Sequence, residues 1–251
     1  MITFRTPKAL KDFDAVSLAE MLRSDFVARF PAKDVQSLND AIQVASYLHR
    51  NDVRRGARST SVNPPYIEHP LRVALRASRT FYCEDASALL AFVLHDTVED
   101  HPFEFKDFVG LHFYGGQDES LARSNALAFI GQTLGYSVAK IVEGMSNPIL
   151  PQGISKADKI DAYQVHVRKE VLKSSFVLLG KVSDFKDNAG SLHHHYAYGD
   201  PKVTYFLDRY EPLLDIYRHA LNTGTHDFSV KSALAALDEV EHQFDRFRAA
   251  A

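Results

Sequence analysis

The chain has 251 residues, of which 45% are hydrophobic and 24% are charged, a composition typical of a soluble globular protein. Its formal net charge of −3 excludes a general attraction to nucleic acid or to anionic membranes, and no apolar run approaches the roughly 20 residues of a transmembrane helix. The single cysteine, Cys83, excludes a disulfide framework and a zinc site built from several thiolates. The first residues carry charges where a signal peptide would be apolar, so we expect a cytoplasmic protein.

Apolar side chains recur with helical spacing along most of the chain, and few stretches alternate with the period of a strand. In chain order, this pattern predicts helices over residues 37–50, 69–81, 85–96, 138–145, 174–185, 205–221 and 232–247. Clusters of Gly, Pro, Ser and Asn predict loops at 52–65, 113–119, 147–155 and 189–201. We therefore predict an all-α fold with an N-terminal extension (1–33), a main helical domain (34–224) and a C-terminal helix packed on that domain (225–251).

The predicted helix at 85–96 is apolar nearly all round, as a central helix should be, yet it ends in charges. His95 and Asp96 close it, and Glu99 and Asp100 follow. If the helix continued, Glu99 would share the face of His95, and Asp100 that of Asp96. Buried charges are costly unless they are paired or bind a metal ion, so this helix end is a candidate functional site.

Two other side chains occupy comparable positions on apolar helices. His69 directly precedes Pro70, which suits the first turn of a helix, and Asp184 follows a strongly apolar run. A catalytic metal site takes three or more protein ligands and leaves a position for water. The candidate ligands are therefore His69, His95, Asp96 and Asp184. Such nitrogen and oxygen donors suit Mn²⁺, Fe²⁺, Zn²⁺ or Mg²⁺, and we expect one Mn²⁺-like ion per chain.

Three motifs occur in a fixed order: "PYIEHP" (65–70), "VLHDTVED" (93–100) and "KVSDFKDN" (181–188). Together they resemble the HD-type hydrolase domain of RelA/SpoT-homologue proteins, which degrade the alarmones ppGpp and pppGpp. The resemblance spans roughly residues 40–220 and implies an HD-domain helical bundle around a buried metal site. The sequence departs from the family at Phe185, where the family has arginine, and by extra residues between Arg54 and Pro65.

The resemblance also implies roles for individual residues. The four candidate ligands named above would bind Mn²⁺. Glu99 and Asp100 would position and activate the water that attacks the 3′-linked phosphate. Asn188 would contact the sugar or base of the nucleotide, and Arg54 would pack on the guanine.

The basic segment "HRNDVRRGAR" (49–58) supplies four arginines in a chain of negative net charge. Arginine pairs bidentately with phosphate and stacks on bases, so this segment suits a nucleotide polyanion. Arg54 has the best register for the base, with Arg55 and Arg58 nearby, and Lys159 is a further candidate phosphate ligand.

These observations predict a stand-alone, Mn²⁺-dependent hydrolase that removes the 3′-pyrophosphate of ppGpp and pppGpp. One alternative is an HD-type phosphohydrolase for another nucleotide, such as an adenosine alarmone, a 5′-nucleotide or a 3′-phosphorylated cofactor. Another is a non-catalytic alarmone-binding protein, although all six metal and catalytic positions are occupied. We expect no nucleic-acid or membrane partner; the sequence leaves open the oligomeric state and a cognate alarmone synthetase, for which this protein would be the antitoxin.

Overall fold

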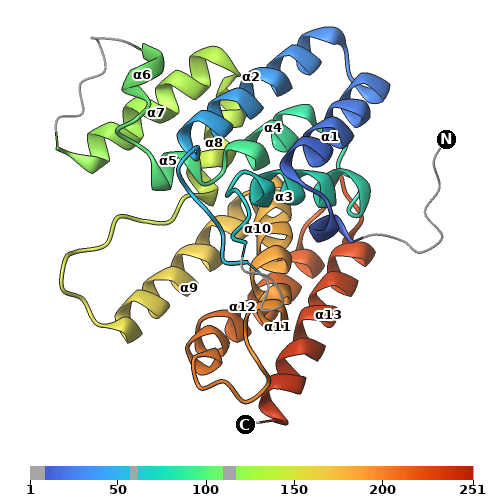
Figure 1. The fold of residues 1–251 in the computed structure, drawn as a ribbon, viewed down its shortest axis with the longest axis vertical. Coiled ribbons are helices and arrows are strands. Elements are labelled where there is room, and N and C mark those ends of the chain that lie inside the picture. The colour runs from blue at the N-terminus through green and yellow to red at the C-terminus, as the bar shows by residue number, and fades with distance from the viewer. Residues whose placement is uncertain (1–8, 57–61, 110–116, 251) are drawn as a thin grey trace.

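The computed structural model describes residues 9–56, 62–109 and 117–250, and in these ranges the regular elements are helical apart from one β-bridge between Val53 and Pro65 (Figure 1). The prediction of an all-α fold is confirmed. The longer helices are α1 (Ala15–Arg29), α2 (Ala32–Leu48), α3 (Glu68–Arg79), α4 (Ala86–Leu94), α7 (Glu119–Thr133), α8 (Tyr136–Met145), α9 (Lys156–Lys173), α10 (Ser175–Asn188), α12 (Val203–Thr223) and α13 (Val230–Arg248). The short ones are η1 (Leu10–Asp12), α5 (Thr97–Asp100), α6 (Lys106–Val109), η3 (Ala189–Ser191) and α11 (Leu192–His195).

Many of these helices begin at a residue whose side chain accepts a hydrogen bond from a backbone amide of the first turn. Such caps satisfy amides that have no partner within the helix. The capping residues are Asp14, Asp85, Asp118, Ser155, Ser174 and Ser229. The helix starts are therefore encoded locally, and packing decides how the helices assemble.

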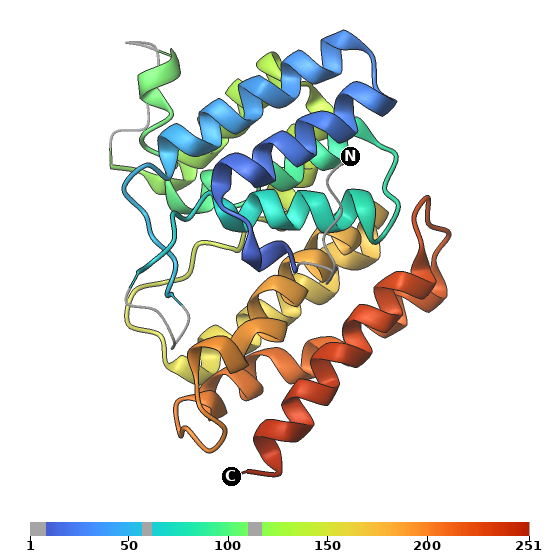
Figure 2. The ribbon, with the colours of Figure 1, turned by 45° about the vertical axis from the view of Figure 1, so that its right-hand side comes forward.

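The arrangement has two halves that meet at α3 and α10. Helix α3 packs against α1, α4 and α10, while α4 also packs against α2 and α8. On the other side, α12 packs against α9 and α13 (Figures 1 and 2). Because α3 packs on the first half and α10 contacts α3, α9, α12 and α13, side chains on the shared face of α3 and α10 lie in the middle of the molecule.

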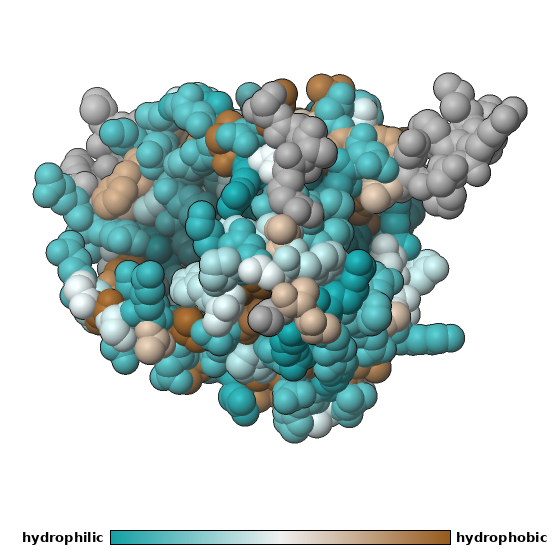
Figure 3. Space-filling view, turned by 60° about the horizontal axis from the view of Figure 1, so that its bottom comes forward, coloured by the Kyte–Doolittle hydropathy of each residue, from teal (hydrophilic) through white to brown (hydrophobic). Residues whose placement is uncertain are grey.

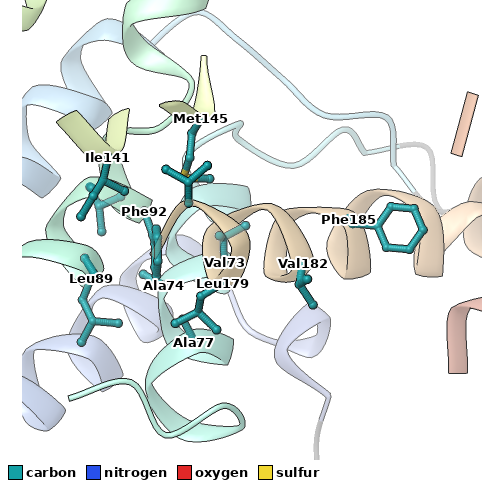
Figure 4. Packing of buried hydrophobic residues seen from close by; sticks show 14 of the residues in the cluster. Val73, Ala74, Ala77, Leu89, Phe92, Ile141, Met145, Leu179, Val182 and Phe185 are labelled. Carbon is teal, nitrogen blue, oxygen red and sulfur yellow. The ribbon is translucent and has the colours of Figure 1, made fainter. Parts of the chain in front are cut away.

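A close contact between α10 and its neighbours α4 and α8 depends on Gly180. A Cβ atom at this position would lie 2.5 Å from the sulfur of Met145 and 2.6 Å from the ring of Phe92. Figure 4 shows Phe92 and Met145 beside α10, within the cluster of buried apolar side chains that also includes Leu179. The missing side chain thus lets α10 approach α4, which carries the candidate site at its end.

Some predicted boundaries differ from the structure. The predicted loop at 189–201 is wrong in its first part, because η3 and α11 continue the helical course and bury Ala189 and Leu192. Helices α1, α7 and α9 were not predicted; α9 fully buries only Val167 and Val171, which leaves a weak apolar pattern. Residues 113–116 of another predicted loop lie outside the described residues.

The face in Figure 3 is mainly hydrophilic, with apolar side chains in small separate patches. Among the described helices, none combines the length and the apolar character that crossing a membrane requires.

Candidate metal centre

The four candidate ligands converge at the junction of α3, α4 and α10. His69 lies in the first turn of α3, His95 ends α4, Asp96 joins α4 to α5, and Asp184 lies on α10. The Nε2 atom of His69 is 3.1 Å from Asp184 Oδ1 and 3.5 Å from Asp96 Oδ2. The Nε2 atom of His95 is 3.0 Å from Asp96 Oδ2 and 3.8 Å from Asp184 Oδ1. Donor atoms of His69, His95 and Asp184 all lie within 4.8 Å of one another, a spacing that can hold a metal ion.

The hydrogen bonds of the two histidines leave their inner nitrogens free to act as ligands. His95 Nδ1 donates to the Phe92 carbonyl at 2.8 Å, and His69 Nδ1 donates to Asp187 Oδ2 at 2.8 Å. In the neutral ring, the Nε2 atom then carries a lone pair. Both Nε2 atoms are buried and lack a hydrogen-bond partner among the described residues. Nitrogen lone pairs and carboxylate oxygens that face one another repel unless a proton or a metal ion lies between them, so a cation between the four groups fits this arrangement.

Electrostatics at the cluster favour a positive charge. Burial alone would lower the pKa of His95, but Asp96 and Asp184 outweigh it and raise the pKa to about 9. Burial would raise the pKa of Asp96, but His95 and then His69 hold it well below its usual value. The carboxylates are therefore ionised at neutral pH, and together they attract a cation.

Tyr66, within the "PYIEHP" motif, supports the cluster through contacts with Asp96 and His69. Its hydroxyl donates to Asp96 Oδ2 at 2.7 Å, and its ring meets the edge of His69 with 5.8 Å between centroids. No role for this residue was predicted from the sequence. This hydrogen bond orients one oxygen of Asp96, and outer partners of metal ligands commonly act in this way.

Asp187 is a second residue that the sequence analysis missed. Its carboxylate is fully buried and accepts hydrogen bonds from His69 Nδ1, from Arg72 Nε at 3.0 Å and from Arg76 Nη2 at 3.0 Å. Arg72 and Arg76 are one turn apart on α3, an unusual position for charges on a helix packed into the core. In the sequence, this pair of arginines on a helix of the core is the feature that could have indicated a buried acidic partner.

We predict that Asp187→Asn weakens metal binding by about 10–100-fold, because the variant no longer offers a carboxylate to orient His69. Asp187→Ala should also lower the free energy of unfolding by roughly 3–5 kcal/mol, since it leaves two arginines without their buried partner. Metal titration and urea unfolding measure the two effects. The matched control is Glu143→Ala, which breaks the exposed pair with Lys140 and should cost less than about 1 kcal/mol. Equal losses in Asp187→Ala and the control would contradict a central role for Asp187.

Glu99 and Asp100 lie on α5, directly after the cluster, and they differ in their surroundings. The two oxygens of Glu99 accept hydrogen bonds from the backbone N–H of Asn147 at 2.7 Å and from its side-chain amide at 2.9 Å. Asp100 is exposed. Desolvation by the surrounding protein, followed by repulsion from Asp96 and Glu99, raises the pKa of Asp100 to about 7. Glu99 is thus held in one orientation, and Asp100 exchanges its proton near neutral pH.

The raised pKa of Asp100 gives the metal-free protein a testable pH dependence. Between the ordinary value of 3.8 and about 7, the folded state binds more protons at this group than the unfolded chain does. Stability from this group therefore falls as the pH rises through that window. We predict that Asp100→Asn stabilises the metal-free protein relative to the parent, and more at pH 8 than at pH 5, in urea unfolding. The same difference at both pH values would contradict the raised pKa.

The structure brings Arg54 and Asn188 to the cluster. The Arg54 guanidinium donates to Asn188 Oδ1, and the Asn188 amide donates to Asp184 Oδ1 at 2.7 Å. Arg54 also lies over the ring of Tyr66, 5.3 Å from its centroid. Backbone pairing of Arg54 N–H with the Pro64 carbonyl holds this arginine in place. Arg54 therefore contacts Asn188 and Tyr66, which form hydrogen bonds with the candidate ligands Asp184 and Asp96, respectively.

The other candidate substrate ligands lie elsewhere. Arg55 lies over the ring of Tyr196, 4.6 Å from its centroid. Lys159 is exposed near the start of α9, and the structure does not bring it to the cluster. Arg58 lies outside the described residues.

Two cavities are lined in part by basic side chains and in part by residues that contact members of the site. One, of about 480 Å³, is lined by Lys11, Arg54, Arg55 and Arg72, with Asp12, Asp14 and Glu68 among its other lining residues. The other, of about 670 Å³, is lined by Arg123, Lys140, Lys169 and Lys173, and by Asn147, the partner of Glu99. Both lie in the size range of small-molecule sites.

No model of a known protein family matches the sequence. The chain is 37% identical over 87 residues to the guanosine-3′,5′-bis(diphosphate) 3′-pyrophosphohydrolase MESH1 of Xenopus tropicalis, a match that covers 35% of this chain and 45% of MESH1. It is 27% identical over 178 residues to the bifunctional (p)ppGpp synthase/hydrolase SpoT of Escherichia coli K12, covering 70% of this chain and 21% of SpoT. The chain thus matches less than half of the length of each relative.

A solved structure, described as a metazoan ortholog of SpoT that hydrolyzes ppGpp, has the same fold. It superimposes with a TM-score of 0.53 at 19% identity, over 85% of this chain and 96% of that one. The buried histidines and aspartates, the sequence matches and the shared fold agree with one another: this chain is a distant homologue of the hydrolases MESH1 and SpoT.

Proposed function

We propose that this protein is a Mn²⁺-dependent hydrolase that removes the 3′-pyrophosphate of guanosine alarmones, converting ppGpp and pppGpp into GDP and GTP. This proposal rests on one observation. The donor atoms of His69, His95 and Asp184 converge, with both histidines buried, directly beside the Glu99–Asp100 pair. The distant homology to MESH1 and SpoT supports the choice of substrate.

The donor set supports Mn²⁺ as the ion. Two imidazole nitrogens and two carboxylates form a mixed set of ligands, which suits a labile divalent ion better than the thiolate sets of structural zinc sites. His69, His95, Asp96 and Asp184 would hold the ion. A divalent ion in such a site polarises a phosphate oxygen and lowers the pKa of a water molecule.

The chain's own residues then have distinct tasks in the reaction. Glu99, fixed by two hydrogen bonds from Asn147, orients the attacking water. Asp100, whose pKa is raised to about 7 in the metal-free protein, accepts a proton from that water, and a cation in the cluster would favour the ionised carboxylate that this task needs. The water oxygen bonds to the phosphorus attached at the 3′ position, the bond between this phosphorus and the 3′ oxygen breaks, and the 3′ oxygen takes up a proton. Pyrophosphate and the 5′-diphosphate or 5′-triphosphate are the products.

Substrate binding relies on the cations at the edge of the cluster. Arg54 lies beside Asn188 and Tyr66 and also lines the cavity of about 480 Å³. A planar guanidinium at this position can stack on a base or pair with phosphate. The nucleotide would therefore enter past Arg54, with its 3′-pyrophosphate directed at Asp96 and Asp184.

The decisive experiment is product identification after incubation of the purified protein with ppGpp and Mn²⁺. We expect GDP and pyrophosphate in equal amounts, loss of turnover with a chelator, and recovery when Mn²⁺ is restored. The same assay on pppGpp, the adenine counterpart and simple 5′-nucleotides tests specificity. Faster turnover of a 5′-nucleotide, or release of orthophosphate from ppGpp, would contradict the proposal and favour a different phosphohydrolase.

Arg54→Ala tests the substrate half of the proposal. If Arg54 stacks on the base, the variant should raise KM by the equivalent of about 1–3 kcal/mol and leave kcat nearly unchanged, because stacking acts alike on ground and transition states. A base-free analogue with the same pyrophosphate should be hydrolysed as before. Arg50→Ala is the matched control, since Arg50 belongs to the same basic segment but lies over Tyr47 and does not line this cavity. A fall in kcat without a change in KM would instead indicate that Arg54 acts through Asn188 on Asp184.

A further inference from the structure

A second group of metal-ligating side chains lies beside the candidate catalytic cluster. His49 ends α2, Asp52 lies three residues later in the same turn, and His101 ends α5. His49 Nδ1 is 2.8 Å from Asp52 Oδ2, and His101 Nε2 is 2.6 Å from the same oxygen. Donor atoms of all three lie within 4.8 Å of one another. The ends of α2 and α5 thus bring two imidazole rings within hydrogen-bond distance of one carboxylate.

The geometry suits a transition-metal ion with little rearrangement. Metal–ligand bonds of about 2.0–2.2 Å in a tetrahedral site place neighbouring donors roughly 3.3–3.5 Å apart. The present separations are shorter by several tenths of an ångström, and the Asp52 side chain, which is 35% exposed, has room to move by that amount. His49 is buried, so its position is fixed by packing. Three protein donors and an open side toward solvent leave a fourth position for water.

The surroundings supply negative charge and orient the histidines. His101 Nδ1 lies 3.7 Å from Glu104 Oε1, so a carboxylate faces the ring nitrogen that does not point at Asp52. The ring of His49 stacks on that of Tyr66, with 4.5 Å between centroids and 24° between planes. Carboxylates behind ligating histidines are common at metal sites because they fix the ring orientation.

Tyr66 connects the two groups of ligands. One face of its ring contacts His49, and its hydroxyl donates to Asp96 Oδ2 in the catalytic cluster. Tyr66 N–H also donates to the Asp52 carbonyl at 3.0 Å. An ion that fixed His49 and Asp52 would therefore fix the ring and the backbone of the residue that orients Asp96.

We propose that His49, Asp52 and His101 form a second metal site, which binds Zn²⁺ and positions Tyr66 against the catalytic cluster. Two nitrogens and one oxygen favour Zn²⁺ over Mg²⁺ or Ca²⁺, which prefer oxygen ligands alone. On binding, the protons now donated to Asp52 move to the opposite ring nitrogens, His49 Nε2 and His101 Nδ1. The site is distinct from the Mn²⁺ cluster and does not depend on which nucleotide the protein hydrolyses.

Zinc stoichiometry tests the site without any measurement of turnover. The full chain is dialysed against Zn²⁺ in four forms: parent, His95→Ala, Asp52→Asn and the double variant. Because His95→Ala disables the catalytic cluster, it should keep one Zn²⁺ per chain. Adding Asp52→Asn should remove that ion, with a loss of affinity of at least about 100-fold, which exceeds the effect of changing an outer partner. The proposal is overturned if the His95→Ala variant binds no Zn²⁺, or if Asp52→Asn does not reduce the bound zinc by one ion.

Further variants guard against an effect of unfolding. His101→Gln replaces the more exposed histidine and should remove the same ion while the far-ultraviolet circular dichroism stays that of the parent. The matched control is His226→Gln, a half-buried histidine that bonds to Ser175 at 2.8 Å, and it should keep all bound zinc. Loss of zinc in the control as well would mean that the ion is not held by the three proposed ligands.

Nitrogen NMR of the histidines identifies the ligand atoms. With Zn²⁺ added to the His95→Ala variant, we expect metal coordination at Nδ1 of His49 and at Nε2 of His101. Unchanged nitrogen chemical shifts at both atoms would show that the three residues form a hydrogen-bonded group only, and they would contradict the proposed metal site. In the parent, loss of zinc from this site should then lower kcat for ppGpp without releasing the catalytic ion.

Discussion

Replacing His95 or Asp184 with alanine is expected to remove the catalytic metal ion and to lower the rate of pyrophosphate release by at least roughly 10³-fold. A bound divalent ion contributes several kcal/mol to transition-state stabilisation, and each 1.36 kcal/mol corresponds to a factor of about ten. His95 Nε2 and Asp184 Oδ1 both face the centre of the cluster, 3.8 Å apart. Elemental analysis and an initial-rate assay with ppGpp measure the two losses.

Folding must be shown to survive these substitutions. His95 is buried at the end of α4, so its truncation also leaves a cavity, whereas Asp184→Asn keeps the shape of the side chain and changes only its charge. Asp184→Asn should therefore lose the ion while urea unfolding of the metal-free protein stays close to that of the parent. If either alanine variant kept its ion and full turnover, the assignment of the catalytic metal ligands would be wrong.

Glu99→Gln is expected to keep the metal ion and to lower kcat by about 10²–10⁴-fold, the usual contribution of a positioned acid or base. KM should change little, because Glu99 acts on the attacking water rather than on the nucleotide. The reason lies in its two hydrogen bonds: both oxygens accept from Asn147, and an amide in this place offers one acceptor and one donor instead. The measurement is steady-state kinetics together with metal content.

Asn147→Ala tests how far the contribution of Glu99 depends on its orientation by Asn147. This variant keeps the carboxylate but removes the side-chain amide that orients it, so kcat should fall by less than in Glu99→Gln. Equal falls would indicate that orientation is the whole contribution of Glu99. Loss of the metal ion from Glu99→Gln would make Glu99 a ligand and require a different assignment.

The all-α fold and the convergence of the candidate ligands could be predicted from the sequence because both follow from differences in polarity between neighbouring residues. His95 and Asp184 interrupt strongly apolar helices, and such interruptions are visible in one dimension. Asp187 escaped notice because its partners are more than 100 residues away, on α3. Lys159 was selected for its charge alone, and charge without a buried setting does not indicate position.

The difference between local patterns and contacts of distant residues also explains why helix α7 and the role of Tyr66 were not predicted. Helix α7 buries only Ala122, Ala126 and Ile130, so its apolar face is too small to stand out in the sequence. Tyr66 lies in a recognised motif, but its contact with Asp96 depends on the pairing of residues 52–54 with 64–66, which follows from the fold. Packing between distant segments therefore accounts for what sequence patterns left out.

The wide separation of the ligands along the chain sets an order of events during synthesis. Asp184 follows Asp96 by 88 residues and His69 by 115. At roughly 5–20 residues per second, a ribosome needs about 4–18 seconds to extend the chain from Asp96 to Asp184. Throughout this interval His69 lacks both Asp184 and its buried partner Asp187. The nascent chain would therefore acquire the proposed catalytic ion only after α10 has emerged and docked on α3, and the bound ion would then tie together segments that a long loop otherwise leaves free to separate.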